Sequence, residues 1–238
     1  MDLQNSIKLF LAALLNIAVP GSGFVAAGYF RLAITTQVLL IAVTAVTCWT
    51  QIIFRPAGAL AWILAVVSAH LFSTVVLLYK LKERRSSLRV KSLIAGLAFA
   101  AAGIGVFICG FVTKEHWLGV HINFVPSASM QPTLEPGDFI LVDTWISLRN
   151  VPAINDVVIF TSPLHKDFLV KRIQAWPESG TTDNEGYFVM GDNRTYSTDS
   201  RHFGGISREQ IKGRVRMVLL SINSDLSLRI NRYLKPVR

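Results

Sequence analysis

Residues 93–113 read LIAGLAFAAAGIGVFICGFVT, a run without a single charged side chain. A transmembrane helix needs about 20 such residues. Residues 32–54 and 57–79 form two more uncharged runs of similar length. We therefore predict three transmembrane helices, over 32–54, 57–79 and 93–113.

The composition agrees with membrane residence. Of the 238 residues, 51% are hydrophobic and only 16% are charged, whereas about 25% of residues in a soluble domain are charged. This argues against a soluble globular protein and against disorder. Cys48 and Cys109 both lie in apolar runs, so we expect no disulfide framework.

Residues 7–30 are also apolar but are interrupted by Pro20-Gly21-Ser22-Gly23. Each half is too short to span a bilayer, and we predict a re-entrant or interfacial hairpin. A signal peptide, with Lys8 before the apolar core and Val25-Ala26-Ala27 as a cleavage site, is the competing interpretation. The downstream helices already provide membrane insertion, which disfavours it.

The loop 80–91 sets the expected orientation. It carries six basic residues and one acidic residue, and positively charged loops stay in the cytoplasm. A nucleic-acid or lipid-binding patch is a weaker interpretation, because the loop lies between two predicted spans. The last span then runs outward, so we expect a multi-pass protein of the cell (inner) membrane with residues 114–238 on the extracytoplasmic, periplasmic side.

From residue 114 onward, short apolar runs alternate with Pro, Gly, Asn and Asp, a pattern typical of an all-β domain. The chain thus divides into a membrane domain, 1–113, and a β domain, 114–238. Ser207 and Gln210 have the spacing of a capping box, which predicts a helical turn. We predict strands over 139–142, 157–160, 168–173, 187–190 and 215–220.

Two polar segments of the β domain stand out. Residues 125–134, VPSASMQPTL, hold small hydroxyl side chains between two prolines, which fix backbone angles. Residues 191–201, GDNRTYSTDSR, directly follow a predicted strand. Either segment alone is more typical of a well-bonded turn than of a catalytic site.

Together with Lys171, the two segments favour a catalytic site. In a strand this lysine shares a face with Leu169 and Ile173, and if that face is buried, desolvation lowers the pKa of the amine. A shift from about 10.4 to about 8 requires roughly 3 kcal/mol, which full burial can supply. A neutral lysine can take a proton from a serine. The alternative is an edge-strand lysine whose amine lies in water.

Residues 126–134, 137–142, 170–173 and 191–201 follow one another in a fixed order. Together they resemble the motifs of type I signal peptidases, membrane-bound serine proteases that use a Ser-Lys dyad. The resemblance covers about 125–221, and it implies a multi-helix transmembrane anchor followed by an antiparallel all-β catalytic domain.

The resemblance also implies roles for individual residues. Ser129 would be the nucleophile and Lys171 the general base, while the Ser127 hydroxyl would join the Ser129 amide in the oxyanion hole. Ser197 would orient the lysine amine. The implied supporting residues are Asp199 and Arg201, as an ion pair behind the site, and Asp192, Asn193 and Arg194, which would shape the turn.

The implied reaction is removal of N-terminal signal peptides from exported preproteins, without a metal or organic cofactor. The substrate would be added as an extended strand. We expect shallow apolar pockets for small residues, lined by Val125, Met130, Leu169 and Val170. The expected partners are preprotein signal peptides and the lipid bilayer, not nucleic acid, and we expect a functional monomer.

The sequence departs from the family pattern at a few positions. Residues 174–179, QAWPES, replace the usual Gly-rich Pro-Gly-Asp turn. Thr195 and Tyr196 stand where the family commonly has Asp-Asn, and His202-Phe203 stand where two aromatic residues are common. None of these departures changes the predicted dyad.

Other functions remain as alternatives. A related protease could serve one dedicated substrate, such as a pilin or conjugation subunit, and a non-catalytic β module could bind exported peptides at the membrane. A self-cleaving Ser-Lys repressor would need a DNA-binding half, which this apolar sequence lacks. A chymotrypsin-like triad or a metal site is disfavoured because the histidines show no suitable spacing: His70, His116, His121, His165 and His202.

Overall fold

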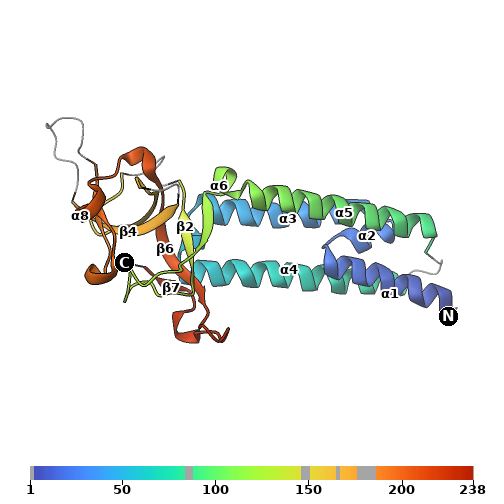
Figure 1. Ribbon diagram of the computed structural model, residues 1–238. Helices are drawn as coiled ribbons and strands as arrows, with labels where there is room; N and C mark the ends of the chain where they lie inside the picture. The colour runs from blue at the N-terminus through green and yellow to red at the C-terminus, as the bar shows by residue number, and fades with distance from the viewer. Residues whose placement is uncertain (1–2, 84–87, 146–150, 165–166, 176–185, 238) are drawn as a thin grey trace. The chain divides into compact units, whose positions relative to one another are not determined.

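The computed structural model describes residues 3–83, 88–145, 151–164, 167–175 and 186–237 (Figure 1). It contains two compact units. The helical unit comprises Met1–Thr50 and Leu60–Thr113, and the β unit comprises Gln51–Ala59 and Lys114–Arg238. The short segment Gln51–Ala59 therefore belongs with the β unit although it joins two helices.

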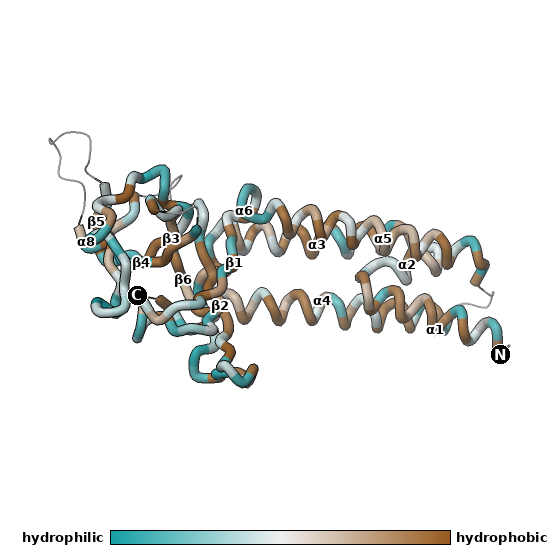
Figure 2. Tube along the Cα trace, in the orientation of Figure 1, coloured by the Kyte–Doolittle hydropathy of each residue, from teal (hydrophilic) through white to brown (hydrophobic). Residues whose placement is uncertain are grey.

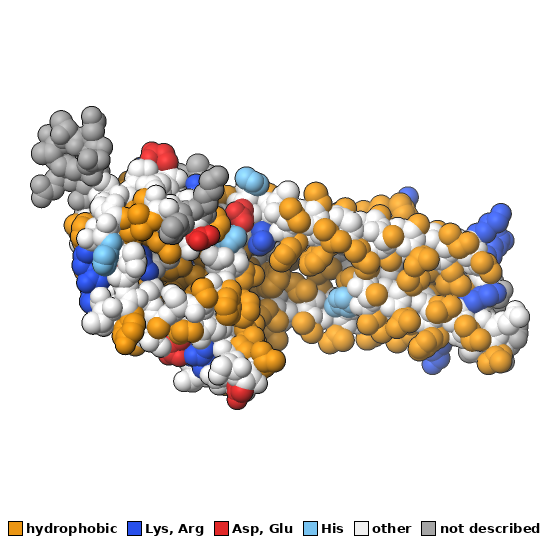
Figure 3. Space-filling view, viewed as in Figure 1, with side chains coloured by type: hydrophobic (Ala, Val, Ile, Leu, Met, Phe, Trp, Pro, Cys, Tyr) orange, Lys and Arg blue, Asp and Glu red, His pale blue; other side chains and the backbone are white. Residues whose placement is uncertain are grey.

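The helical unit contains three helices that are long and apolar enough to cross a membrane. They are α3 (Phe30–Trp49), α4 (Pro56–Glu83) and α5 (Val90–Val112). Hydrophobic residues run along all three (Figure 2), and their side chains cover much of the visible helical surface (Figure 3). A large exposed apolar surface of this kind is typical of membrane or protein interaction sites.

The observed helix ends differ from the predicted ones by one to five residues, most at the C-terminal ends of the first two long helices. The first long helix ends at Trp49 rather than at residue 54, because Gln51 adopts a left-handed conformation (φ 59°) and a 3₁₀ turn (Ile52–Phe54) follows. The second continues past residue 79 to Glu83. Lys80, Leu81 and Lys82 are good helix formers, so the helix continues beyond its apolar part.

The predicted break in residues 7–30 separates α1 (Leu3–Ala18) from α2 (Ser22–Ala26). Asn16, which is fully buried, bridges the break. Its Oδ1 accepts a hydrogen bond from the Gly21 amide at 2.8 Å, and its Nδ2 donates to Ser73 Oγ at 3.0 Å and Thr74 Oγ1 at 3.3 Å. One side chain thus satisfies backbone left unpaired by the break and ties it to α4.

The larger segment of the β unit starts with a short helix, α6 (Lys114–Trp117), and the main feature of the unit is an antiparallel sheet. Seven strands form it in the described part of the chain, in the order β1-β2-β6-β3-β4-β5, with β7 also paired to β6. The strands are β1 (Val120–Phe124), β2 (Asp138–Asp143), β3 (Val157–Thr161), β4 (Phe168–Ala175), β5 (Phe188–Met190), β6 (Ile211–Ser221) and β7 (Lys235–Pro236).

Each of the five predicted strands overlaps an observed one, and the capping box of Ser207 and Gln210 is present before β6. The prediction missed β1 and β7 and made the last long strand too short. Strand β6 begins at Ile211, and its exposed or half-exposed Lys212 and Arg214 alternate with buried Gly213 and Val215. Alternating burial of this kind is typical of a strand with one face in the core.

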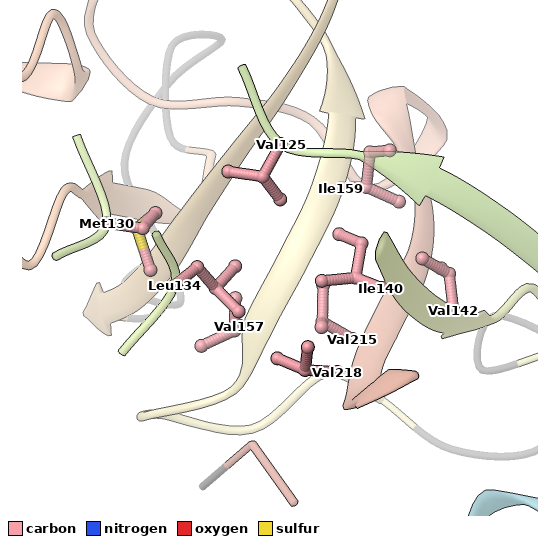
Figure 4. Packing of buried hydrophobic residues seen from close by; sticks show 9 residues of the cluster. All are labelled: Val125, Met130, Leu134, Ile140, Val142, Val157, Ile159, Val215 and Val218. Atoms are coloured by element: carbon pink, nitrogen blue, oxygen red, sulfur yellow. The ribbon is translucent and has the colours of Figure 1, made fainter. Parts of the chain in front are cut away.

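The sheet has hydrophobic clusters on both faces of β3. Val157 and Ile159 belong to one cluster, whereas Val158 and Phe160 belong to the other. Double-sided burial explains why this strand is continuously apolar in sequence. Figure 4 shows the first cluster, which also contains Met130 and Leu134 from the loop before β2.

Replacing Asn16 with alanine should destabilise the helical unit, because the Gly21 amide would lose its partner within an apolar environment. We expect the free energy of unfolding to fall by about 1–3 kcal/mol, measured as a lower melting temperature of the protein in detergent. The control is Thr35→Ala, since the Thr35 hydroxyl is exposed and bonds only to the helix carbonyl of Arg31 at 2.8 Å. Equal melting of both variants would contradict the bridging role of Asn16.

Candidate active site

Ser129 lies in the loop between β1 and β2, between Pro126 and Pro132. The Gln131 amide donates to the Ala128 carbonyl at 3.1 Å, and the Leu134 amide donates to the Met130 carbonyl at 2.9 Å. Met130 and Leu134 are almost completely buried in the core. Internal hydrogen bonds and two buried side chains therefore fix the loop on both sides of Ser129.

Strand β4 brings Lys171 to this loop. The Lys171 side chain is only 3% exposed, and its Nζ donates a hydrogen bond to Ser129 Oγ at 2.8 Å. Ser129 itself is 8% exposed. Burial lowers the pKa of Lys171 below its ordinary value, although the negative charge of Asp199 partly opposes the shift.

Ser127 lies two residues before Ser129, and the two Oγ atoms are 3.2 Å apart. Unlike Ser129, Ser127 is exposed to solvent. A hydroxyl at this place can donate a hydrogen bond to an oxyanion next to Ser129. The structure thus brings Ser127, Ser129 and Lys171 together.

Asp199 is the centre of the charged network behind the lysine. It is fully buried and accepts hydrogen bonds from the Gly191 amide at 2.9 Å and from Ser197 Oγ at 2.7 Å. Arg201 binds both carboxylate oxygens, at 2.8 and 3.0 Å. Burial alone would raise the pKa of Asp199, but these hydrogen bonds hold it well below its usual range.

The Ser197 hydroxyl donates its hydrogen bond to Asp199. Its expected role of orienting the lysine amine stays a prediction. Asp199 acts on Lys171 through its charge, because it raises the pKa that burial lowers.

The other expected supporting residues hold the neighbouring turn. Asn193 donates from its amide to the Ser129 carbonyl at 3.1 Å and from Nδ2 to the Ala128 carbonyl at 3.2 Å. Asp192 forms a two-bond ion pair with Arg172, at 2.8 and 2.7 Å. The Arg194 carbonyl accepts from Arg201 at 2.7 Å. The segment 191–201 is thus attached to the Ser129 loop and to β4.

The four residues expected to line a substrate pocket do not share one environment. Val125 and Met130 are buried in the cluster of Figure 4, and Val170 packs against it. Leu169 packs against the second cluster, because neighbouring residues of a strand point to opposite faces. The expected turn at 174–179 is wrong for Gln174 and Ala175, which belong to β4, and its other residues lie outside the described part.

Two residues of the site were not singled out from the sequence. A side chain at Gly191 would place its Cβ 2.3 Å from Ser197 Oγ and 2.5 Å from the Ser129 carbonyl oxygen. Thr133 accepts a hydrogen bond from Arg172 at its Oγ1, at 3.2 Å. Gly191 could have been noticed in the sequence, because it starts a polar segment directly after a strand.

In the described residues, no group of three or more His, Cys, Asp or Glu side chains could hold a metal ion. His121 contacts Glu115 and Asn123, and His202 lies beside Asp199 at the start of α8 (Ser200–Phe203). These contacts join residues that are close in sequence and do not include the Lys171–Ser129 hydrogen bond. The candidate reactive arrangement is therefore the buried amine of Lys171 bonded to the Ser129 hydroxyl.

Comparison with known proteins gives a consistent result. Three relatives are "Thylakoidal processing peptidase 1, chloroplastic" of Arabidopsis thaliana (30% identical), "Probable signal peptidase I-1" of Synechocystis sp. (28%) and "Signal peptidase I V" of Bacillus subtilis (28%). The matches cover 38%, 38% and 37% of this chain and 39%, 66% and 79% of the relatives. The chain thus spans less than two thirds of the first two.

The profile of the family described as "Signal peptidase, peptidase S26" matches residues 91–182 and 177–220. These ranges include α5, the serine loop, the strand of Lys171 and the segment 191–201. The chain belongs to the signal peptidase family, peptidase S26.

Proposed function

We propose that the protein is a membrane-anchored serine endopeptidase that removes N-terminal signal peptides from exported preproteins. The observation that carries the proposal is the 2.8 Å hydrogen bond between Lys171 Nζ and Ser129 Oγ, made by a lysine that is only 3% exposed. A lysine desolvated in this way can be neutral and can act as a base. The names of the relatives support the substrate class.

The proposed reaction starts with proton transfer from Ser129 Oγ to the neutral amine of Lys171. The oxygen attacks the scissile carbonyl, and the Ser129 amide and Ser127 hydroxyl donate hydrogen bonds to the resulting oxyanion. Lys171 then returns the proton to the departing amine of the mature protein. A water molecule, activated by the same lysine, hydrolyses the acyl-enzyme.

We also propose the membrane arrangement. Helices α3, α4 and α5 would each cross the cell membrane, with the basic loop 80–91 in the cytoplasm. The segment after α3 and the segment after α5 then emerge on the same, extracytoplasmic side. The grouping of Gln51–Ala59 with the β unit supports this arrangement. The substrate would be a preprotein held in the same bilayer, and the enzyme would act as a monomer.

The dyad is tested by Ser129→Ala and Lys171→Ala in the full-length protein, assayed on a preprotein in detergent. We expect each to reduce turnover by about 10³-fold or more, because neither half of such a unit works alone. Ser224→Ala and Lys212→Ala are matched controls, since both side chains are exposed in the β unit. Cleavage that persists in folded dyad variants would refute the proposal, and a panel of preproteins would separate general from dedicated use.

The pH profile of turnover should report the desolvated lysine. Because the neutral amine is the base, the rate should rise with pH, with a midpoint below the ordinary lysine pKa of 10.5. Asp199→Asn removes the charge that favours the protonated amine, so it should move this midpoint to still lower pH. Asp225→Asn, which changes an exposed carboxylate, should leave it unchanged. A midpoint at or above 10.5 would contradict the desolvation argument.

Gly191→Ala should impair catalysis because its Cβ would overlap Ser197 Oγ and the Ser129 carbonyl oxygen, at 2.3 and 2.5 Å. A displacement of the nucleophile by about 1 Å can lower the rate of the chemical step by about 10²-fold. We expect a lower kcat with a protein that remains folded. Gly105→Ala is the control, because a Cβ there meets no atom within 4 Å. Wild-type kcat in Gly191→Ala would contradict the predicted overlap.

A further inference from the structure

The chain continues beyond the residues that the family profile matches. After Ser221 it turns away from β6, passes through a 3₁₀ turn (Ile230–Arg232) and returns as β7 beside β6 (Figure 1). The Ile222 amide donates to the Gly137 carbonyl at 3.0 Å, and the Arg229 amide donates to the Ser221 carbonyl at 2.9 Å. This C-terminal segment, residues 221–236, is therefore bonded to the turn 135–138.

Arg232 makes the central contacts of the C-terminal segment. It is 3% exposed, and its Nε and Nη2 bind the two carboxylate oxygens of Asp138 at 2.9 and 2.5 Å. Its Nη1 donates to Glu135 Oε1 at 2.7 Å. Its Nη2 also donates to the Thr133 carbonyl at 3.1 Å. The planar guanidinium thus joins Thr133 and Glu135 of the loop that follows Ser129 to Asp138 at the start of β2.

The Asp138 carboxylate that binds Arg232 is held by further hydrogen bonds. It is fully buried and also accepts hydrogen bonds from Ser221 Oγ at 2.6 Å and from the Glu135 amide at 2.9 Å. Burial alone would raise the pKa of Asp138, but the hydrogen bond from Arg232 and these additional bonds lower it overall. The carboxylate is therefore ionised and fully paired at neutral pH.

A second arginine of the segment holds the same turn. Arg229 donates from Nη1 to Glu135 Oε2 at 2.5 Å and from Nη2 to the carbonyls of Pro136 and Ile222. Gly137 has a φ of 96°, and a Cβ there would lie 2.0 Å from the Ile222 carbonyl oxygen. The turn thus has a glycine where the C-terminal segment packs directly on its backbone.

Thr133 connects this arrangement to the catalytic dyad. Its carbonyl accepts from Arg232, and its Oγ1 accepts from Arg172, the neighbour of Lys171, at 3.2 Å. The next residue, Leu134, is bonded through its amide to Met130, which follows Ser129 directly. A displacement of Thr133 would therefore move the serine relative to the strand that carries the lysine.

We propose that Arg232 is a positioning residue for the Ser129–Lys171 pair, which holds the nucleophile loop in register with β4 through the Thr133 carbonyl, Glu135 and Asp138. The proposal rests on the proposed function, because it assigns Arg232 to the same reaction. Arg232 itself touches neither Ser129 nor Lys171 through the bonds described above. Its effect should be on the geometry of the dyad and not on substrate binding or on the pKa of the lysine.

Arg232→Lys in the full-length protein is the test, because lysine keeps the charge beside Asp138 but cannot reach the four acceptors at once. We expect kcat on a preprotein to fall about tenfold, with KM within about twofold and the midpoint of the pH profile unchanged. Hydrogen exchange should be faster in residues 128–135 and unchanged in β3. The matched control is Arg214→Lys, since Arg214 also belongs to the β unit and pairs with a carboxylate, Asp156, at 3.0 Å.

Folded Arg232→Lys with wild-type kcat and exchange would overturn the proposal, and so would a raised KM with unchanged kcat. If Arg232→Lys does not fold, Glu135→Gln replaces it, because this change removes one carboxylate of the network but leaves Asp138. Faster exchange in 128–135 with a kcat lowered about twofold or more supports the proposal, and no change refutes it. A wild type that cleaves no preprotein would refute the proposed function, while the exchange measurement still decides whether Arg232 holds the loop.

Discussion

The proposed role of Lys171 as the base for Ser129 requires a neutral amine. The lysine must therefore be buried without being strongly stabilised as a cation. Asp199 opposes this condition, because its charge raises the pKa of the amine. Arg201 binds both oxygens of that carboxylate and thereby balances much of its charge. The Asp199–Arg201 pair can therefore order the segment behind the lysine without keeping the lysine protonated. A lone buried carboxylate could not do both.

Asn193 bonds the segment 191–201 to the serine loop, and a bond from the Gly191 amide orders that segment internally. Asn193 binds the carbonyls of Ala128 and Ser129, and the Gly191 amide binds Asp199. Backbone contacts of this kind require close approach, which explains a glycine where a Cβ would overlap Ser129 and Ser197. The small side chains of the two motifs thus follow from packing as well as from chemistry.

Much of this architecture could be predicted from local patterns in the sequence. Uncharged runs of about 20 residues, long enough as helices to cross a bilayer, predict the three long helices. Short apolar runs between turn residues predict five strands. Helix ends were harder, since the left-handed Gln51 has no signature in composition. Strand β1 was missed although Val120, Ile122 and Phe124 alternate with polar residues, and β7 is only two residues long. The proximity of Ser129 and Lys171 was expected from the family motifs and not from periodicity, which does not define a site.

The long-range ion pairs could not be predicted, for a topological reason. Asp138 and Arg232 are 94 residues apart in sequence, and the chain has 24 lysines and arginines that could pair with this carboxylate. Strand order removes the ambiguity, because β2 pairs with β6 and Asp138 lies opposite Ser221. The segment that follows Ser221 must then begin beside Asp138, and Arg232, eleven residues later, is within reach of it. A contact that is distant in sequence is therefore local once the register of two strands is known.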